Sequence, residues 1–256
     1  LKGCFWDDVM PLAIVNFRAV LLFGAVALSG CAGTGQTTGM NDGINDPFEP
    51  TNRSIHAFNK AVDGLILAPA AEIYSIVPPE LREMLDNGAG NLGEPRNFVN
   101  HVLQGDPESA GVVLARFLLN STVGIAGLGD PAAEIGLFSR TTDFGETMAV
   151  WGLPSGPYIE LPFFGASSVR DSIGIVVDLA IDPLNYVITD EQAYYLLALR
   201  GLSLVGDRLA YADLVNTLLY ESTDSYAAQR LAYIQNKRRA VAGETVVEDL
   251  DDPFAQ

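Results

Sequence analysis

A short apolar run near the start of the chain, Ala19 to Leu28, most constrains which residues can belong to a fold. An apolar segment of about ten residues is too short to span the hydrocarbon of a bilayer, and it suits the core of a signal peptide. The alternative is a buried helix followed by a turn. We interpret residues 1–30 as a signal peptide that is removed, and we leave them out of the predicted fold.

The residues that close this run, Leu28-Ser29-Gly30-Cys31, resemble a bacterial lipobox. The resemblance implies cleavage after Gly30 and attachment of acyl chains to Cys31, and Ala32 in the next position favours the outer membrane. Two or more acyl chains anchor a protein stably, whereas a single myristoyl chain binds only marginally. The mature chain is therefore predicted to be held at a membrane through Cys31.

Removal of the leader takes away two basic and two acidic residues, so the net charge stays at -17. This acidity argues against nucleic acid as a partner. It also opposes adsorption to an anionic lipid surface, so membrane contact would come from acyl chains and apolar burial. Cys4 leaves with the leader and Cys31 is acylated, so no disulfide is expected.

Composition divides the remaining chain into three parts. Residues 31–45 are rich in Gly, Thr and Asn and are expected to form a lipidated flexible tether. Residues 46–242 contain no repeat or low-complexity break and are expected to fold as one domain. Residues 243–256 are expected to form an acidic, mobile tail. No apolar run after the leader reaches the ~18 residues of a transmembrane candidate.

Asp-Pro pairs recur along the chain, and this pair suits a helix start because Asp caps free N–H groups and Pro fixes the first helical φ. The pairs are Asp46-Pro47, Asp106-Pro107, Asp130-Pro131, Asp182-Pro183 and Asp252-Pro253. Apolar residues at helical spacing predict amphipathic helices over 112–120, 202–219 and 227–234. Only Tyr158 to Phe164 alternates as a strand does, within a Gly/Pro-rich connection over 151–168. We therefore expect a mainly α domain.

Catalytic and metal-binding patterns are weak. Gly165 to Val169 resembles half of a nucleophile elbow around Ser167, but it lacks the closing Gly, and both histidines precede it. His56 and His101 are 45 residues apart and match no zinc spacing. No glycine motif leads to a phosphate-binding lysine. We expect no enzyme activity, no metal and no cofactor. Both histidines are expected to form hydrogen bonds, either on helix surfaces or in partly buried positions.

Five ordered clusters are rich in Asn, Gly, Pro and paired polar residues, whose ordinary role is capping and bonding between helices. They are Asn52-Arg53 with Phe58-Asn59 and Asp63; Asn91-Leu92 with Glu94-Pro95, Asn100 and Leu103 to Gly105; Arg116-Phe117 with Asn120 to Thr122, Gly124, Gly127 and Asp130-Pro131; Asp143 to Gly145 with Thr147 and Trp151-Gly152; and Gly156 to Tyr158 with Leu161-Pro162, Gly165, Ser167 and Arg170-Asp171. In this order the clusters resemble the MlaA/VacJ family of outer-membrane lipoproteins, over about residues 46–233.

The resemblance implies a single ring-shaped helical domain with an amphipathic central channel, lying in the inner leaflet of the outer membrane of a Gram-negative bacterium. It implies removal of mislocalised phospholipids from the outer leaflet, which maintains lipid asymmetry. The implied partners are phospholipid, an outer-membrane porin trimer, a periplasmic lipid-shuttle protein and an inner-membrane transporter complex. A structural porin-binding adaptor without lipid-channel activity is the alternative.

The resemblance also assigns roles to residues. It makes Cys31 the lipid-attachment site, and it connects Asn52, Arg53, Phe58 and Asn59 with placement in the leaflet. The channel or gating candidates are Gly145, Trp151, Gly152, Gly156, Tyr158, Gly165, Arg170 and Asp171, with Gly152 and Gly156 as hinges and Trp151 and Tyr158 at the interfacial level. His56 stands where Tyr is common and Ala166 replaces a frequent Pro, which leaves the geometry of gating open.

Overall fold

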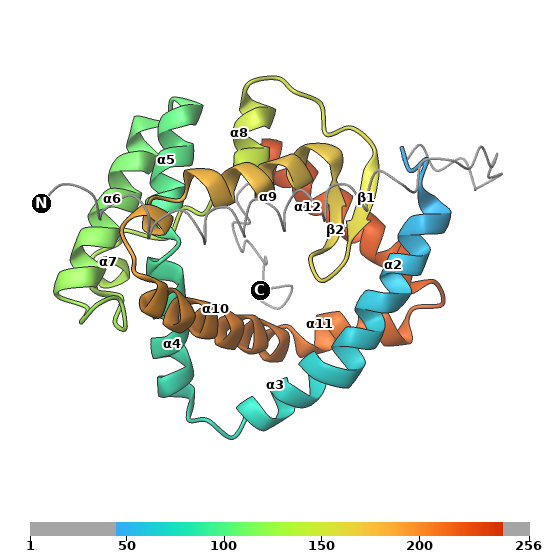
Figure 1. The fold of residues 1–256 in the computed structure, drawn as a ribbon, viewed down its shortest axis with the longest axis horizontal. Helices are drawn as coiled ribbons and strands as arrows, with labels where there is room; N and C mark the ends of the chain where they lie inside the picture. The colour runs from blue at the N-terminus through green and yellow to red at the C-terminus, as the bar shows by residue number, and fades with distance from the viewer. Residues whose placement is uncertain (1–44, 243–256) are drawn as a thin grey trace, which may run out of the picture. The chain divides into compact units, whose positions relative to one another are not determined.

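The computed structural model describes residues 45–242, so Cys31, the predicted leader and tail, and residues 31–44 of the predicted tether lie outside the described residues. The elements are α2 (Glu49–Val62), η1 (Asp63–Leu67), α3 (Ala68–Tyr74), α4 (Pro79–Asn91), α5 (Glu94–Gln104), α6 (Pro107–Thr122), α7 (Pro131–Glu134), α8 (Phe144–Val150), β1 (Tyr158–Leu161), β2 (Gly165–Ser168), α9 (Val169–Ile181), η2 (Pro183–Tyr186), α10 (Asp190–Ala210), α11 (Ala212–Asn216), η3 (Thr217–Glu221) and α12 (Ser225–Ala242). The prediction of a mainly α chain is confirmed (Figure 1).

Local signals explain several helix starts. The carboxylates of Asp106, Asp130 and Asp182 accept backbone N–H groups two or three residues later, at 3.0–3.1 Å, as predicted. The predicted start at Asp46 is wrong, because α2 begins at Glu49 and the Asp46 carboxylate accepts from side chains instead. Asp252 lies outside the described residues.

The strand-like piece at Tyr158 is confirmed, but it is half of a hairpin. β1 pairs antiparallel with β2, in a register that sets Tyr158 opposite Ser168 and Leu161 opposite Gly165. The sequence did not predict β2, because its small residues show no alternation of apolar and polar side chains. In the turn between the strands, Phe163 has φ 68, in the left-handed region.

The described elements contact one another in a closed sequence that can be followed in Figure 1. From α2 the contacts run to β1, β2, α9, α8 and α5. They continue from α5 to α6, α4, α10 and α3, and α3 leads through η1 back to α2. α12 contacts β2, α8 and η3. Contacts between elements that are distant in sequence therefore complete this closed circuit of contacting elements.

The distribution of polarity in the described chain differs from that of an ordinary soluble domain, in which apolar side chains dominate the buried set. Fully buried polar groups include Asn100, Thr147 and Glu160, whereas Leu65 and Ile76 are 79% and 81% exposed. The buried apolar residues are Ala71, Tyr74, Ala110, Val113, Ala132, Met148, Tyr158 and Tyr226. Among residues 45–242, no helix has the length and apolar character needed to cross a bilayer. Extensive exposed apolar surface indicates contact with an apolar environment.

Candidate functional site

One face of α2 binds the free edge of β1. Asn52, His56 and Asn59, which we call the α2 clamp, follow one another at four- and three-residue spacing and therefore share that face. The Asn52 amide accepts the N–H of Glu160 at 3.0 Å and donates to the carbonyl of Tyr158 at 3.2 Å. An edge strand otherwise leaves such groups without partners. The amide of Asn52 thus takes the place of a neighbouring strand.

Asn59 binds the turn end of the hairpin in the same way. Its side-chain oxygen accepts the N–H of Phe163 at 2.8 Å, and its NH₂ group donates to the carbonyl of Leu161 at 3.0 Å. Phe58 packs edge to face on Phe163, with 5.1 Å between ring centroids. Neighbouring residues of α2 therefore fix both the backbone and an aromatic side chain of the turn.

A carboxylate lies at the centre of the clamp. Glu160 is only 2% exposed, and its Oε1 accepts from Asn59 at 3.1 Å and lies 3.1 Å from Nδ1 of His56. The other ring nitrogen of His56 lies 2.9 Å from Oγ of Ser225, at the start of α12. His56, predicted to form hydrogen bonds on a helix surface or partly buried, is 5% exposed and has a partner at each ring nitrogen. A buried carboxylate such as that of Glu160 requires such donors.

The order Ser225, His56, Glu160 has the connectivity of a hydrolase triad. A triad also requires backbone donors aimed at the developing oxyanion. At the start of α12, however, the N–H of Ala227 already donates to the Asp224 carboxylate at 3.1 Å. This hydrogen bond leaves the Ala227 amide unavailable as an oxyanion donor. The contacts of His56 with Glu160 and Ser225 instead join α2, β1 and the start of α12.

The other groups considered for chemistry have structural partners. The hydroxyl of Ser167 lies 2.9 Å from that of Ser172. His101 is buried, and its Nε2 lies 2.9 Å from the carbonyl oxygen of Arg140. No three His, Cys, Asp or Glu side chains in the described part of the chain are grouped so that they could hold a metal ion.

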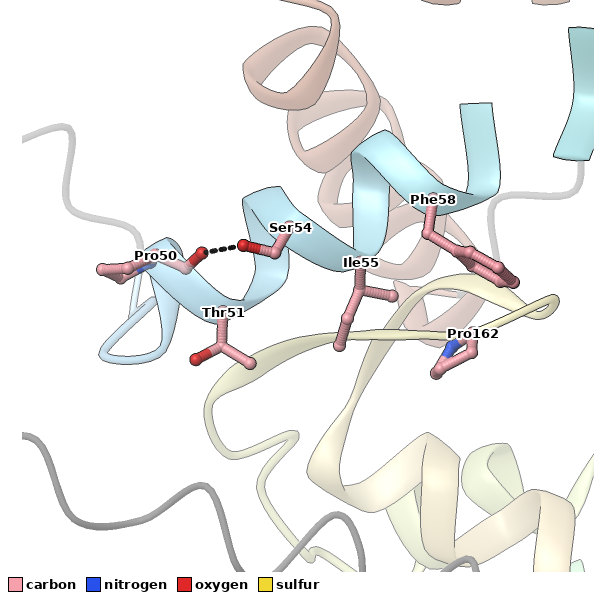
Figure 2. Close-up of a pocket in the computed structure, with 6 residues that line it drawn as sticks. All are labelled: Pro50, Thr51, Ser54, Ile55, Phe58 and Pro162. Atoms are coloured by element: carbon pink, nitrogen blue, oxygen red, sulfur yellow. Dashed lines mark hydrogen bonds between the residues drawn. The ribbon is translucent and has the colours of Figure 1, made fainter. Parts of the chain in front are cut away.

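A pocket of about 510 Å³ opens beside the clamp. In Figure 2, the side chains of Thr51, Ile55 and Phe58 project from one side of α2, and Pro162 of the hairpin turn faces them. The lining residues are Pro50, Thr51, Ser54, Ile55, Phe58 and Pro162. None of them is titratable, so this pocket offers apolar surface rather than acid–base chemistry.

Asp46 links the residues before α2 to α12. Its carboxylate accepts from Asn52 at 2.9 Å, from the guanidinium of Arg230 at 2.7 Å and from the hydroxyl of Tyr226. Burial, reinforced by the hydrogen bond to Asp46, raises the pKa of Tyr226 far above its usual range. The backbone carbonyl of Asn45 accepts the N–H of Tyr158 at 2.8 Å. The start of the described chain is thus bound to both the hairpin and α12.

Arg53 provides an exposed link between α2 and α12. Its guanidinium donates two hydrogen bonds to Asp224, at 3.0 and 2.9 Å, and one to Glu49 at 2.8 Å. The hydrogen bond from Arg53 lowers the pKa of Asp224 to about 2, against the opposing effect of partial burial. Arg53 therefore has an anchoring role in this structure.

Arg170 and Asp171 lie where the hairpin joins α9. Arg170 donates to the carbonyl of Leu153 at 3.2 Å and to Asp171 at 3.3 Å. Asp171 also accepts the hydroxyl of Tyr233 of α12 at 2.6 Å. Burial, together with this hydrogen bond, raises the pKa of Tyr233. These contacts connect the 151–157 segment to both α9 and α12.

Lys237 of α12 reinforces this junction. Its ammonium lies 3.1 Å from Asp143, 3.3 Å from Glu146 and 3.6 Å from Asp171. Burial alone would lower the pKa of Lys237, but the three carboxylates outweigh it and raise that pKa above its usual value. The cation thus holds α12 against α8 and α9.

The connection over residues 151–157 is largely exposed. Trp151 is half-exposed and its indole N–H donates to the carbonyl of Leu103 at 3.0 Å. Gly152 and Gly156 have φ of 86 and 73, a region that glycine adopts without strain. The two predicted hinges therefore occupy backbone conformations that favour glycine over residues with a Cβ.

Gly145 lies in a close helix contact rather than in a turn. A Cβ on Gly145 would lie 2.7 Å from the Asp171 carboxylate, and a Cβ on Gly174 would lie 2.5 Å from the backbone nitrogen of Gly145. Gly165, with φ 77, lies at the start of β2, and a Cβ there would lie 3.3 Å from the amide of Gln229. Small residues thus allow α8 and α9 to approach and α12 to lie against the hairpin.

Replacing Gly174 by alanine is expected to lower the free energy of unfolding by about 1–3 kcal/mol, because the new methyl group overlaps the backbone of α8. Urea unfolding of the detergent-solubilised protein, followed by circular dichroism, measures this. Gly111→Ala is the control, since nothing lies within 4 Å of a Cβ at Gly111 in α6. A neutral or stabilising effect is expected there, and equal losses in both variants would contradict the close contact.

The structure thus brings Asn52, Phe58, Asn59, Tyr158 and Gly165 together around the hairpin. It places Arg53, Arg170 and Asp171 in links to α12 and α9. Gly145 lies in the contact of α8 with α9, and Trp151 is bound to α5. The sequence did not single out Glu160, Ser225, Tyr226, Arg230 and Lys237. Their partners are too distant along the chain for spacing to reveal.

Comparisons with known proteins agree with this architecture. Residues 44–240 match the MlaA lipoprotein family. The intermembrane phospholipid transport system lipoprotein MlaA of Escherichia coli K12 is 33% identical over 245 residues, which cover 93% of this chain and 93% of that protein. The protein of the same name from Haemophilus influenzae is 32% identical, over 89% of this chain and 91% of its own.

A solved structure, described in work on the structural basis for maintenance of bacterial outer membrane lipid asymmetry, matches the fold with a TM-score of 0.63. It is 32% identical, and the match covers 75% of this chain and 96% of that one. The sequence clusters, the helical fold and these similarities agree, and the chain belongs to the MlaA lipoprotein family.

Proposed function

We propose that this protein is an outer-membrane lipoprotein that removes mislocalised phospholipids from the outer leaflet and so maintains the lipid asymmetry of a Gram-negative outer membrane. Its family membership supports this function, because the E. coli relative is named as the lipoprotein of an intermembrane phospholipid transport system. The observation that carries the proposal is the inverted polarity of residues 45–242, with exposed large apolar side chains around a polar interior. Moving a lipid in this way requires no covalent step.

The closed circuit of contacting elements supports a ring-shaped domain with an amphipathic central channel. Its exposed apolar side chains would lie among acyl chains, and its polar side chains would face the head group in transit. Amphipathic helices that lie in one leaflet bind by burying an apolar face. The domain would therefore lie in the inner leaflet, anchored through acylated Cys31.

The hairpin and the 151–157 connection are the proposed gate of this channel. Gly152 and Gly156 would act as hinges, and the α2 clamp would set the closed position of the hairpin. Asn52, Phe58 and Asn59 would then act on lipid passage through the hairpin they hold. Trp151 begins the 151–157 connection, and Tyr158 begins the hairpin that follows it.

The proposed partners would set the direction in which lipid moves. An outer-membrane porin trimer would hold the ring beside the outer leaflet, and a periplasmic lipid-shuttle protein would carry lipid to an inner-membrane transporter complex. A passive channel permits movement both ways, so any bias must come from stronger binding and removal of lipid at one end.

Replacing Asn59 by alanine is expected to loosen the hairpin, because three side-chain hydrogen bonds to Glu160, Leu161 and Phe163 are lost. At about 1 kcal/mol each, local opening becomes on the order of 100-fold more frequent. Hydrogen exchange measured by mass spectrometry on peptides covering the hairpin tests this. Asn185→Ala is the control, because this exposed side chain lies away from the hairpin and donates to the carbonyl of Leu179. Unchanged exchange in the Asn59 variant would show that the clamp does not hold the hairpin.

Deletion of the gene tests the function itself. We expect more phospholipid on the cell surface, detected by its access to added phospholipase, and greater sensitivity to detergent with chelator. The full chain should restore the normal surface, whereas Cys31→Ala, which cannot be acylated, should not. Unchanged surface phospholipid in the deletion strain would contradict the proposed function.

A further inference from the structure

Charged groups at the junction of α3, α4 and α10 are not paired with one another. Arg82 is half-buried, its Nε has no hydrogen-bond partner, and within residues 45–242 it forms no ion pair. Asp86 lies one turn later on the same helix, a spacing at which opposite charges usually meet. The buried arginines Arg116 and Arg208, by contrast, are paired with carboxylates. Arg82 and Asp86 are thus a cation and an anion on one helix that do not pair with each other.

A second carboxylate and an unsatisfied hydroxyl complete the group. A Cβ on Gly206 of α10 would lie 3.1 Å from Oδ1 of Asp86 and 3.5 Å from the ring of Tyr74, so glycine leaves room between them. The Tyr74 hydroxyl is buried without a hydrogen-bond partner. Partial burial and the nearby charge of Asp86 raise the pKa of Asp207, the residue after Gly206. Asp207 directly follows Gly206, whose Cβ position lies beside Asp86, so two carboxylates of like charge come close together at this junction, an arrangement that favours a bound cation.

We infer that this junction binds the head group of a zwitterionic phospholipid, with the phosphate on Arg82 and the primary ammonium between Asp86 and Asp207. This assignment rests on the proposed function and adds a preference among phospholipids. A guanidinium matches a phosphate in charge and geometry. An ammonium is favoured over Ca²⁺, because Ca²⁺ takes at least about six oxygen ligands and the group offers two carboxylates and a hydroxyl.

The site is accessible and lies beside apolar surface. Asp86 and Asp207 are exposed, and Arg82 is partly so. Leu81, next to Arg82 in α4, is a large, exposed apolar side chain, which could receive the start of an acyl chain. A lipid whose head group has a phosphate but no amine would bring its negative charge to the same two carboxylates. The junction should therefore favour phosphatidylethanolamine over phosphatidylglycerol.

The test uses the purified full-length protein in mixed micelles that contain equal amounts of phosphatidylethanolamine and phosphatidylglycerol with the same acyl chains. Bound lipid is quantified by mass spectrometry. We expect the wild type to retain an excess of phosphatidylethanolamine, and Asp86→Asn with Asp207→Asn to lower the ratio about fivefold, the scale of partly exposed ion pairs. Arg82→Gln should reduce the binding of both lipids.

Glu80→Gln is the matched control, since it removes one carboxylate from the opposite face of α4 and should leave the ratio unchanged. Asp207→Asn alone is a second, milder variant and should shift the ratio in the same direction. An unchanged ratio in the double variant, or an equal shift in Glu80→Gln, would overturn the head-group site while lipid binding itself persists. A wild type that retains no phospholipid would instead refute the proposed function together with the site.

Discussion

Replacing Arg116 by methionine is expected to lower the free energy of unfolding by about 3–5 kcal/mol, the usual effect of removing one partner of a buried ion pair. Arg116 is 6% exposed, and its guanidinium donates to Glu94 and to Asp130 at 2.9 Å each, and to the carbonyl of Leu137. Without Arg116, the carboxylate of the nearly fully buried Glu94 would have no cation beside it. Urea unfolding followed by circular dichroism measures the loss.

Arg140→Met is the matched control for this variant. Arg140 also pairs with a carboxylate, that of Glu108 at 3.0 Å, with both side chains exposed, and it donates to the hydroxyl of Ser109 at 2.9 Å. Exposed pairs contribute about 0–1 kcal/mol and a typical hydrogen bond about 1 kcal/mol, so this substitution should cost at most about 2 kcal/mol. If both variants lost the same free energy, or if Arg116→Met lost less than about 1 kcal/mol, Arg116 would not be the centre that holds α5, α6 and α7 together.

Replacing Asp63 by alanine is expected to have a similar effect, again about 3–5 kcal/mol. Asp63 is 5% exposed and accepts from Arg208 at 2.7 and 3.2 Å and from Tyr220 at 2.8 Å. It begins the π-helical turn η1, so its side chain joins α2 and η1 to α10 and η3. In the variant, Arg208 keeps only the side-chain oxygen of Asn216 as a hydrogen-bond partner.

Tyr220 provides a second measurement on the same variant. Burial, and then the hydrogen bond to Asp63, raises the pKa of Tyr220 from 10.0 to about 12. Because the folded state keeps this proton longer than the unfolded state, the wild type loses stability as pH rises from 10 to 12. In Asp63→Ala the pKa should fall and the loss should be smaller.

Absorbance titration of tyrosinate, taken as the difference from a Tyr220→Phe variant, isolates this hydroxyl. Asp213→Ala, which removes an exposed carboxylate of α11, should leave the titration of Tyr220 unchanged. A Tyr220 that still titrates near 12 in Asp63→Ala would show that Asp63 does not contribute to the raised pKa.

The parts of the fold that sequence predicts are those with local causes. Asp106, Asp130 and Asp182 cap the backbone two or three residues away, and so an Asp-Pro pair suffices to place each helix start. Asp46 has the same local sequence, but its carboxylate accepts from Tyr226 and Arg230, more than 170 residues later. Tertiary partners therefore override the local signal at Asp46.

The candidate site shows the same division. Asn52 and Asn59 were recognised through a family motif, yet the sequence did not reveal that their amides satisfy the edge of β1. The link from His56 to Glu160 and Ser225 spans separations of 104 and 169 residues. Such pairs exist only once the fold is formed. Period and spacing indicated amphipathic helices, but they did not predict that so many charged groups would be buried between them.

Photocrosslinking from Leu153 in growing cells tests most directly whether phospholipid passes the hairpin. Leu153 is exposed in the 151–157 connection, and an unnatural photoreactive residue there reports what lies beside the proposed gate. The same residue at Asp213, exposed on α11, serves as the control. We expect phospholipid adducts at Leu153, more of them when Asn59→Ala is also present, and none at Asp213. Adducts to protein alone at Leu153 would contradict lipid passage and would favour a porin-binding adaptor.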